Sequence, residues 1–169
     1  SNKSKGLMKC LAIASLGLSL GLSTGASHAA GEKFVMVSHA PDSDSWWNTI
    51  KNAIKQAGED FNVTVDYRNP PNGDLADMAR LIEQSAARNY DGLIADIADF
   101  SVLQKPLGTV VAKKIMLVTI NSGTIAQSEQ LKAIMHVGQP EYDAGLGAGK
   151  RAKEAGIKSF VCVNHYAMN

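Results

Sequence analysis

The sequence predicts an α/β protein whose core is a doubly wound parallel sheet. Short apolar segments of strand length alternate with segments of helical periodicity five times between residues 34 and 163, and such alternation builds βαβ units with parallel strands. The segment 115–120 is apolar at nearly every position, as expected for a strand buried on both faces of the sheet. Polar residues directly follow several strands, so we expect them to meet at the carboxyl edge of the sheet.

The first half of the chain contains three predicted strands and two predicted helices. Ser45 is a plausible N-cap and Gly58 a plausible end for the first helix, and Asp74 can cap the second. The second helix carries apolar residues at helical spacing up to Ala86. The strands are expected over residues 34–38, 63–67 and 93–95, and the helices over 45–58 and from 74 to 86.

The second half continues the alternation. A helix follows Asp99, and the helix over residues 140–155 contains many small residues. Strands are expected over 115–120, 133–137 and 160–163. Cys162 lies in the last of these and is expected to be a small core residue. Because the chain stops at Asn169, where a strand would lead into another helix, we expect it to be a fragment of a longer protein.

Residues 1–29 are expected to be a secretory signal peptide. Lys3, Lys5 and Lys9 form a positive segment, and residues 11–22 form an apolar run that is short for a membrane span. Small residues flank His28, so we expect cleavage after Ala29. A membrane anchor is the alternative. Without this segment the chain keeps 14 of its 17 basic residues against 16 acidic ones, and because no basic stripe exists, nucleic acid is not an expected partner.

Several stretches resemble catalytic or cofactor-binding motifs but do not match them in detail. The glycine-rich stretch 144–151 lacks the spacing of a dinucleotide fingerprint and the hydroxyl residue of a phosphate loop. His39, Asp42 and Asp44 have neither calcium-loop nor zinc-ligand spacing, and no nucleophile elbow is present. We therefore expect no cofactor, no metal and no catalytic residue. One enzymatic alternative stays open, in which the carboxylates of Asp44, Asp91, Asp96 and Asp99 converge.

The loop after the first strand and the residues that follow later strands predict a site for a small polar molecule. Trp46 and Trp47 are the chain's two tryptophans. One of them can offer a flat apolar face to the C–H side of a sugar, while carboxylates and amides bond its hydroxyls. In the competing interpretation both indoles pack a helix and the polar residues are turn residues and caps. The predicted ligand-binding residues are His39, Asp44, Trp46, Trp47, Asp96, Asn121, Ser122 and Asn164.

The order and spacing of these segments resemble a known family. The segments 34–38 and 48–53 around the paired aromatics are similar to the opening of type I periplasmic sugar-binding proteins, the group of the ribose-binding protein. The segments 90–94, 114–123 and 137–145 resemble later landmarks of that family. The resemblance covers residues 32–169.

The resemblance implies a periplasmic receptor for an ABC importer, with two α/β lobes that close on a sugar or polyol. Residues 30–138 would supply most of the first lobe and residues 139–169 the incomplete start of the second. Trp46 and Trp47 would stack on the sugar. Several family members have Asp-Arg after the fourth strand, both touching sugar, whereas this chain has Asn121-Ser122, which removes a charged pair.

The resemblance also implies a permease at the inner membrane as a partner. The same fold can instead present a sugar or autoinducer to a chemoreceptor or sensor kinase, which is a second hypothesis. A repressor of the lactose type shares the fold, but the predicted signal peptide and the missing helix-turn-helix argue against it.

Overall fold

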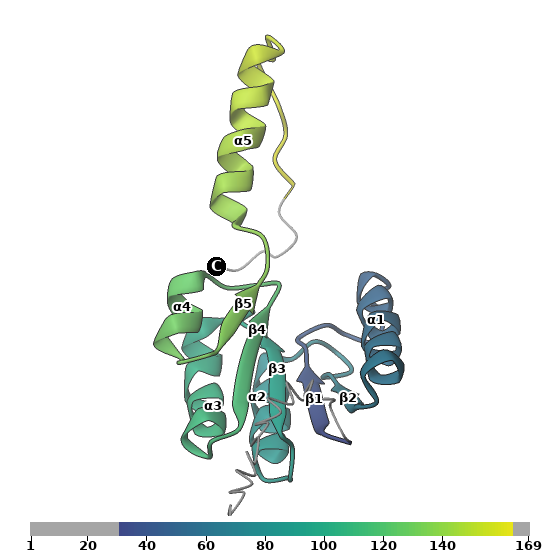
Figure 1. The fold of residues 1–169 in the computed structure, drawn as a ribbon. Helices are drawn as coiled ribbons and strands as arrows, with labels where there is room; N and C mark the ends of the chain where they lie inside the picture. The colour runs from purple at the N-terminus through teal and green to yellow at the C-terminus, as the bar shows by residue number, and fades with distance from the viewer. Residues whose placement is uncertain (1–30, 164–169) are drawn as a thin grey trace, which may run out of the picture.

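The computed structural model describes residues 31–163, and it contains one five-stranded parallel sheet in the order β2-β1-β3-β4-β5 with helices on both faces (Figure 1). The doubly wound α/β prediction is confirmed. The predicted signal peptide and Asn164 lie outside the described residues. The elements are β1 Lys33–Val37, α1 Trp46–Phe61, β2 Thr64–Arg68, α2 Leu75–Ala86, β3 Gly92–Asp96, α3 Phe100–Ala112, β4 Met116–Ile120, α4 Ile125–Gln130, β5 Met135–Val137 and α5 Glu141–Glu154.

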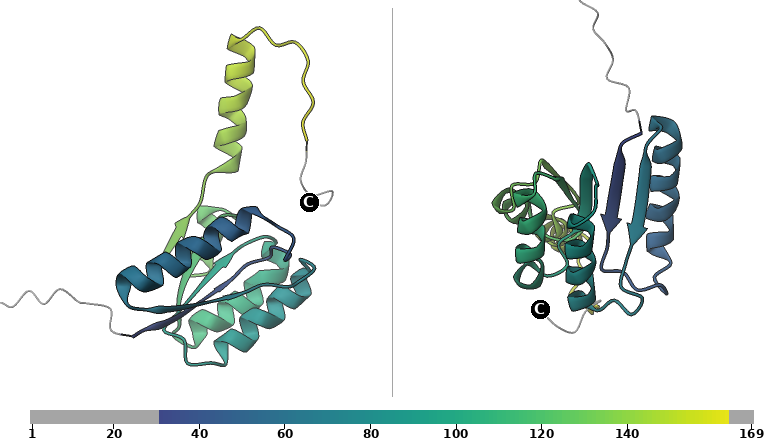
Figure 2. Two further views of the ribbon diagram at one scale, coloured as in Figure 1. Left: turned by 90° about the vertical axis from the view of Figure 1, so that its right-hand side faces the viewer. Right: turned by 90° about the horizontal axis from the view of Figure 1, so that it is seen from below.

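One face of the sheet carries the main hydrophobic core. Successive strand side chains point to opposite faces, so Val35 and Val37 lie in this core while Met36 packs with Trp47 on the other side. Helices α2 and α3 cover the main core, and α1 covers the opposite face of β1 and β2 (Figure 2). The apolar face predicted for α2 is confirmed, because three of its four members are buried: Met78, Ile82 and Ala86.

The second face is only half covered. Helix α1 leaves the β4–β5 side open, where Met116, Met135 and Val137 are each about half exposed. Between α1 and these strands lies an apolar trough of about 750 Å³. None of the helices described over residues 31–163 is long and apolar enough to cross a bilayer.

Helix α1 differs at both ends from the sequence prediction. Ser45 makes no side-chain cap; the carboxylate of Asp44 instead accepts the backbone N–H of Trp46 at 3.0 Å. The helix runs past Gly58 and ends at Phe61, and its C-cap Asn62 adopts the left-handed conformation. Gly58 has a different role, because a Cβ there would lie 3.0 Å from the carbonyl oxygen of Val63. It permits the close return of the chain into β2.

The chain after β5 also departs from the prediction. Helix α5 extends away from the sheet (Figure 1) and has no buried residue. The strand expected over residues 160–163 is wrong, and Cys162 is exposed and not a core residue. An apolar run becomes a strand only beside another strand that pairs its backbone, and here Val161 and Val163 are each 88% exposed. The short helix α4 was not predicted. Thr124 and Gln127 begin it with a capping box.

The packing of the core predicts that two leucine substitutions will have different effects on stability. Leu107 of α3 has no exposed surface, whereas Leu146 of α5 is 57% exposed. We expect Leu107→Ala to lower the free energy of unfolding by about 2–5 kcal/mol, because it leaves a cavity. Leu146→Ala should change it by less than about 0.5 kcal/mol. Urea unfolding followed by circular dichroism measures both, and equal losses would contradict this description of the core.

Candidate functional site

The carboxyl ends of β1, β3 and β4 lie side by side because these strands are paired in parallel. Val37 is opposite Ala95, and Asp96 is opposite Ile120. Polar residues therefore follow neighbouring strands at one edge. The N–H of Ile97 donates to the carbonyl oxygen of Ser122 at 3.1 Å, which ties the turn after β3 to the turn after β4.

The turn after β4 is shaped by two unusual backbone conformations. Asn121 has a φ of 57°, a left-handed conformation that asparagine tolerates better than most residues. Gly123 has a φ of 98°, and a Cβ there would lie 2.7 Å from Cβ of Ile97. This turn can pack against the end of β3 because position 123 has no side chain.

The loop after β1 is held on its outer side by β2 and the turn that follows. The side-chain amide of Asn69 donates to the carbonyl oxygen of Ala40 at 2.8 Å and to the carboxylate of Asp42 at 2.9 Å. The hydroxyls of Ser38 and Tyr67 bond each other at 2.5 Å. These contacts give the loop a fixed path toward α1.

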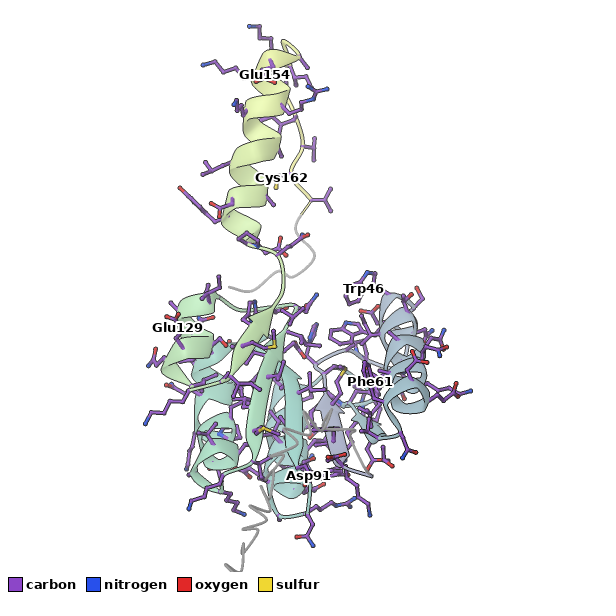
Figure 3. The ribbon with its side chains drawn as sticks, viewed as in Figure 1. Trp46, Phe61, Asp91, Glu129, Glu154 and Cys162 are labelled. Carbon is purple, nitrogen blue, oxygen red and sulfur yellow. The ribbon has the colours of Figure 1, made fainter. Side chains whose placement is uncertain are left out.

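The two tryptophans have different environments. Trp46 is 54% exposed at the first position of α1, whereas Trp47 is 2% exposed in the second core cluster. Their rings meet edge to face with centroids 5.3 Å apart. Figure 3 shows Trp46 at the end of α1 that is nearer to α5. Trp47 thus packs against Trp46 and supports it, while about half of the surface of Trp46 stays exposed.

His39 and Asp96 form a buried pair beneath the loop. Asp96 has no exposed surface. One carboxylate oxygen accepts the backbone N–H of His39 at 3.0 Å, and the other bonds Nδ1 of its ring. The ring of His39 also meets Trp47 edge to face at 5.7 Å. Burial lowers the pKa of His39, but the hydrogen bond to Asp96 and the charges of Asp96 and Asp44 outweigh it, so the pKa lies above its usual 6.5.

A recess of about 370 Å³ opens at this edge of the sheet. Six of the eight predicted site residues line it: His39, Asp44, Trp46, Trp47, Asn121 and Ser122. Asp96 lies behind His39, and Asn164 falls outside the described residues. Glu141, the first residue of α5, also lines the recess and was missed. Its position at the start of a predicted helix gave no reason to place it near β1.

The carboxylates named in the open enzymatic alternative do not converge. Asp91 precedes β3 at the opposite end of the sheet (Figure 3), where it accepts the backbone N–H of Lys33 at 2.7 Å. Asp99 caps α3 and accepts the N–H of Val102 at 3.2 Å. Over residues 31–163 no three histidine, cysteine or acidic side chains are grouped to hold a metal ion. The recess is suited to hydrogen bonding and stacking.

Sequence comparison agrees with this architecture. The family model described as "Periplasmic binding protein domain" matches residues 34–166. The chain belongs to this family. It is a family of binding proteins, and its members include sugar-binding proteins of ABC importers. No curated protein matches the chain.

Solved structures of sugar-binding proteins resemble this chain over about three quarters of its length. A carbohydrate transporter from Acidothermus cellulolyticus 11B in complex with myo-inositol is 33% identical, with a TM-score of 0.71 over 76% of this chain and 44% of that one. An arabinose-binding protein from Geobacillus stearothermophilus is 27% identical, with a TM-score of 0.62 over 75% and 42%. A glucose-galactose binding protein from the same species is 22% identical, with a TM-score of 0.67 over 75% and 44%. The present chain therefore spans less than half the length of each.

The different environments of the two indoles predict different fluorescence. Trp47→Phe leaves Trp46, whose emission should be red-shifted and strongly quenched by acrylamide because more than half of the residue is exposed. Trp46→Phe leaves Trp47, whose emission should be blue-shifted and protected. Each variant serves as the control for the other. Equal Stern–Volmer constants would show that the indoles share one environment and would contradict the proposed support of Trp46 by Trp47.

Proposed function

We propose that the protein captures a sugar or a sugar-like polyol in the periplasm for uptake by an ABC importer. The observation that carries this proposal is the half-exposed indole of Trp46 in the same recess as the polar groups of Asp44, Asn121 and Ser122. A sugar ring has an apolar C–H side and a rim of hydroxyls. The indole suits the first, while the carboxylate, amide and hydroxyl groups suit the second.

The charges around the recess disfavour an anionic ligand. Asp44 and Glu141 line it and Asp96 lies behind it, against one histidine. An anionic ligand would meet three carboxyl groups there. The similar solved proteins are described with myo-inositol, arabinose or glucose and galactose, which are neutral hydroxylated molecules. We infer the same class here, with binding and release and no chemical conversion.

The recess in the described residues is one side of the proposed binding site. Residues 30–138 would form the first lobe and residues 139–169 the beginning of a second, which would close over the ligand. Glu141 supports this division, because it lines the recess from the element that leaves the sheet. A signal peptide over residues 1–29 would direct the protein to the periplasm, and a permease of the inner membrane would receive the closed, loaded form.

A second candidate function is presentation of the ligand to a sensor protein. One similar structure, 25% identical, is a complex of two proteins, XylFII and LytSN. A receptor of this fold can therefore be the partner of another protein. Neighbouring genes for a permease and an ATPase would favour import, whereas a neighbouring sensor-kinase gene would favour presentation.

The proposed stacking predicts a loss of affinity in one aromatic variant and no loss in another. The full-length mature protein should bind one or more of myo-inositol, glucose, galactose, arabinose and xylose in calorimetric titration. Trp46→Ala should weaken that binding about tenfold or more, a difference of about 1.4 kcal/mol. Phe61→Ala is the matched control, because Phe61 is an exposed aromatic at the far end of the same helix. Equal effects of the two variants, or no binding to any of these sugars, would contradict the proposal.

The two-lobe arrangement predicts that residues 30–169 alone bind weakly. The recess is open, and Trp46 keeps more than half of its surface exposed, whereas ligand sites usually bury most of the ligand. Binding should therefore be at least about 100-fold weaker than in the full-length protein, a difference of about 2.7 kcal/mol. Titration of both forms with the same sugar measures this ratio. Equal affinities would show that the described lobe suffices.

A further inference from the structure

We propose that Gly138 is a positioning residue of the binding site. Because it has no side chain, the chain passes close to the backbone of Asn121, and this contact fixes where Asn121 stands at the recess. Gly138 follows β5 directly and does not itself line the recess. The inference rests on the proposed function, since it assigns a role toward a residue that we propose contacts the ligand.

The carbonyl group of Asn121 fills the space that a side chain at position 138 would need. A Cβ on Gly138 would lie 2.7 Å from the carbonyl oxygen of Asn121 and 2.6 Å from Nε2 of His136. Both distances are shorter than the roughly 3.5 Å at which non-bonded atoms pack. The backbone of Gly138 does not have a positive φ, so the close approach is what requires glycine here.

The ring of His136 has little freedom to make room for a larger residue. Nδ1 of His136 bonds Oγ1 of Thr119 at 2.9 Å. Thr119 has no exposed surface, and its hydroxyl also donates to Oγ of Ser128 at 2.7 Å. Rotation of the imidazole away from Gly138 would break its bond to this buried hydroxyl. A larger residue at position 138 would therefore displace the backbone of Asn121.

The turn that begins with Asn121 is held from two sides, and Gly138 lies on one of them. The N–H of Asn121 donates to the carbonyl oxygen of Val137 at 2.9 Å, and on the other side the carbonyl oxygen of Ser122 accepts the N–H of Ile97 at 3.1 Å. The opposite wall of the recess comes from the loop after β1 and the start of α1. A shift of this turn would therefore change the spacing between the groups that we propose contact the ligand.

Gly138 also precedes the segment that leads into α5. Glu141, three residues further on, begins α5 and lines the recess, and Figure 1 shows α5 leaving the sheet from the end of β5. Gly138 thus contacts one residue of the recess wall, Asn121, and is close in sequence to another. Gly108 of α3 has no such surroundings, because a Cβ there would meet nothing within 4 Å.

The test is a double-substitution cycle on the full-length mature protein, titrated calorimetrically with myo-inositol or whichever sugar of the panel binds wild type. Gly138→Ala should weaken binding about tenfold, as expected when one hydrogen bond to the ligand is lost. Asn121→Gly removes the amide and tolerates the left-handed conformation. In that background Gly138→Ala should weaken binding by less than about twofold more, because the group that it displaces is gone. Gly108→Ala is the matched control and should leave the affinity unchanged.

A measurement without ligand accompanies the titrations. The NMR signals of the Asn121 backbone and side-chain amides should move in Gly138→Ala and stay in place in Gly108→Ala. Near-UV circular dichroism of both variants should match that of wild type, because the substitution at position 138 displaces one turn at the edge of the sheet and leaves the core intact.

Several outcomes would overturn the inference. Losses of affinity that add fully in the double variant would show that position 138 acts on the site without Asn121. Unchanged Asn121 signals in Gly138→Ala would show that no displacement occurs, and a Gly138→Ala protein without native near-UV circular dichroism would assign the glycine to the fold as a whole. Failure of wild type to bind any sugar would instead refute the proposed function, and the NMR comparison would still report whether Gly138 positions Asn121.

Discussion

Parallel pairing of β1, β3 and β4 is the constraint on which the candidate site depends. It places the residues after these strands at one edge, although they are far apart in the sequence. The turns then bond one another through the backbone, as between Ile97 and Ser122. Because the strands are anchored in a core that includes Val35, Leu93 and Leu117, this edge is a rigid base from which side chains project.

The polar residues at the strand ends form one part of the candidate site. The loop before α1 leads to its aromatic part. Trp47 is buried with Met36 and Ala40, so it fixes the start of the helix. Trp46, one position earlier, then has to point away from that core. Adjacent residues on a helix are separated by about 100°, and this geometry lets one aromatic residue anchor the helix while its neighbour stays exposed. Trp47 is thus the structural member of the pair, and Trp46 is the member that we propose contacts the ligand.

The sequence was sufficient to predict the sheet, its parallel strands and six residues of the recess, because all of these depend on local patterns repeated along the chain. It did not predict Glu141, since that position depends on where the segment after β5 leaves the sheet. It also did not separate the buried Asp96 from the partly exposed strand-end residues Asn121 and Ser122. Both kinds follow an apolar strand, and only the path of the loop in three dimensions shows that His39 covers the carboxylate.

The strand predicted over residues 160–163 failed for a related reason. Apolar composition indicates that a segment can be buried, but burial needs a neighbour. In the described residues α5 and the segment after it have no sheet to join, and Phe160 is 77% exposed. The same condition applies to the open β4–β5 face, where Val137 and Met135 are exposed beside the trough.

The buried pair of His39 and Asp96 links the stability of the fold to the shape of the candidate site. A buried carboxylate without a partner is strongly unfavourable, so Asp96 requires the hydrogen bonds from His39, and these bonds fix the loop that leads to Trp46. The same contacts hold the imidazole at the wall of the recess. The pair therefore couples the buried end of β3 to the position of the loop that carries Trp46.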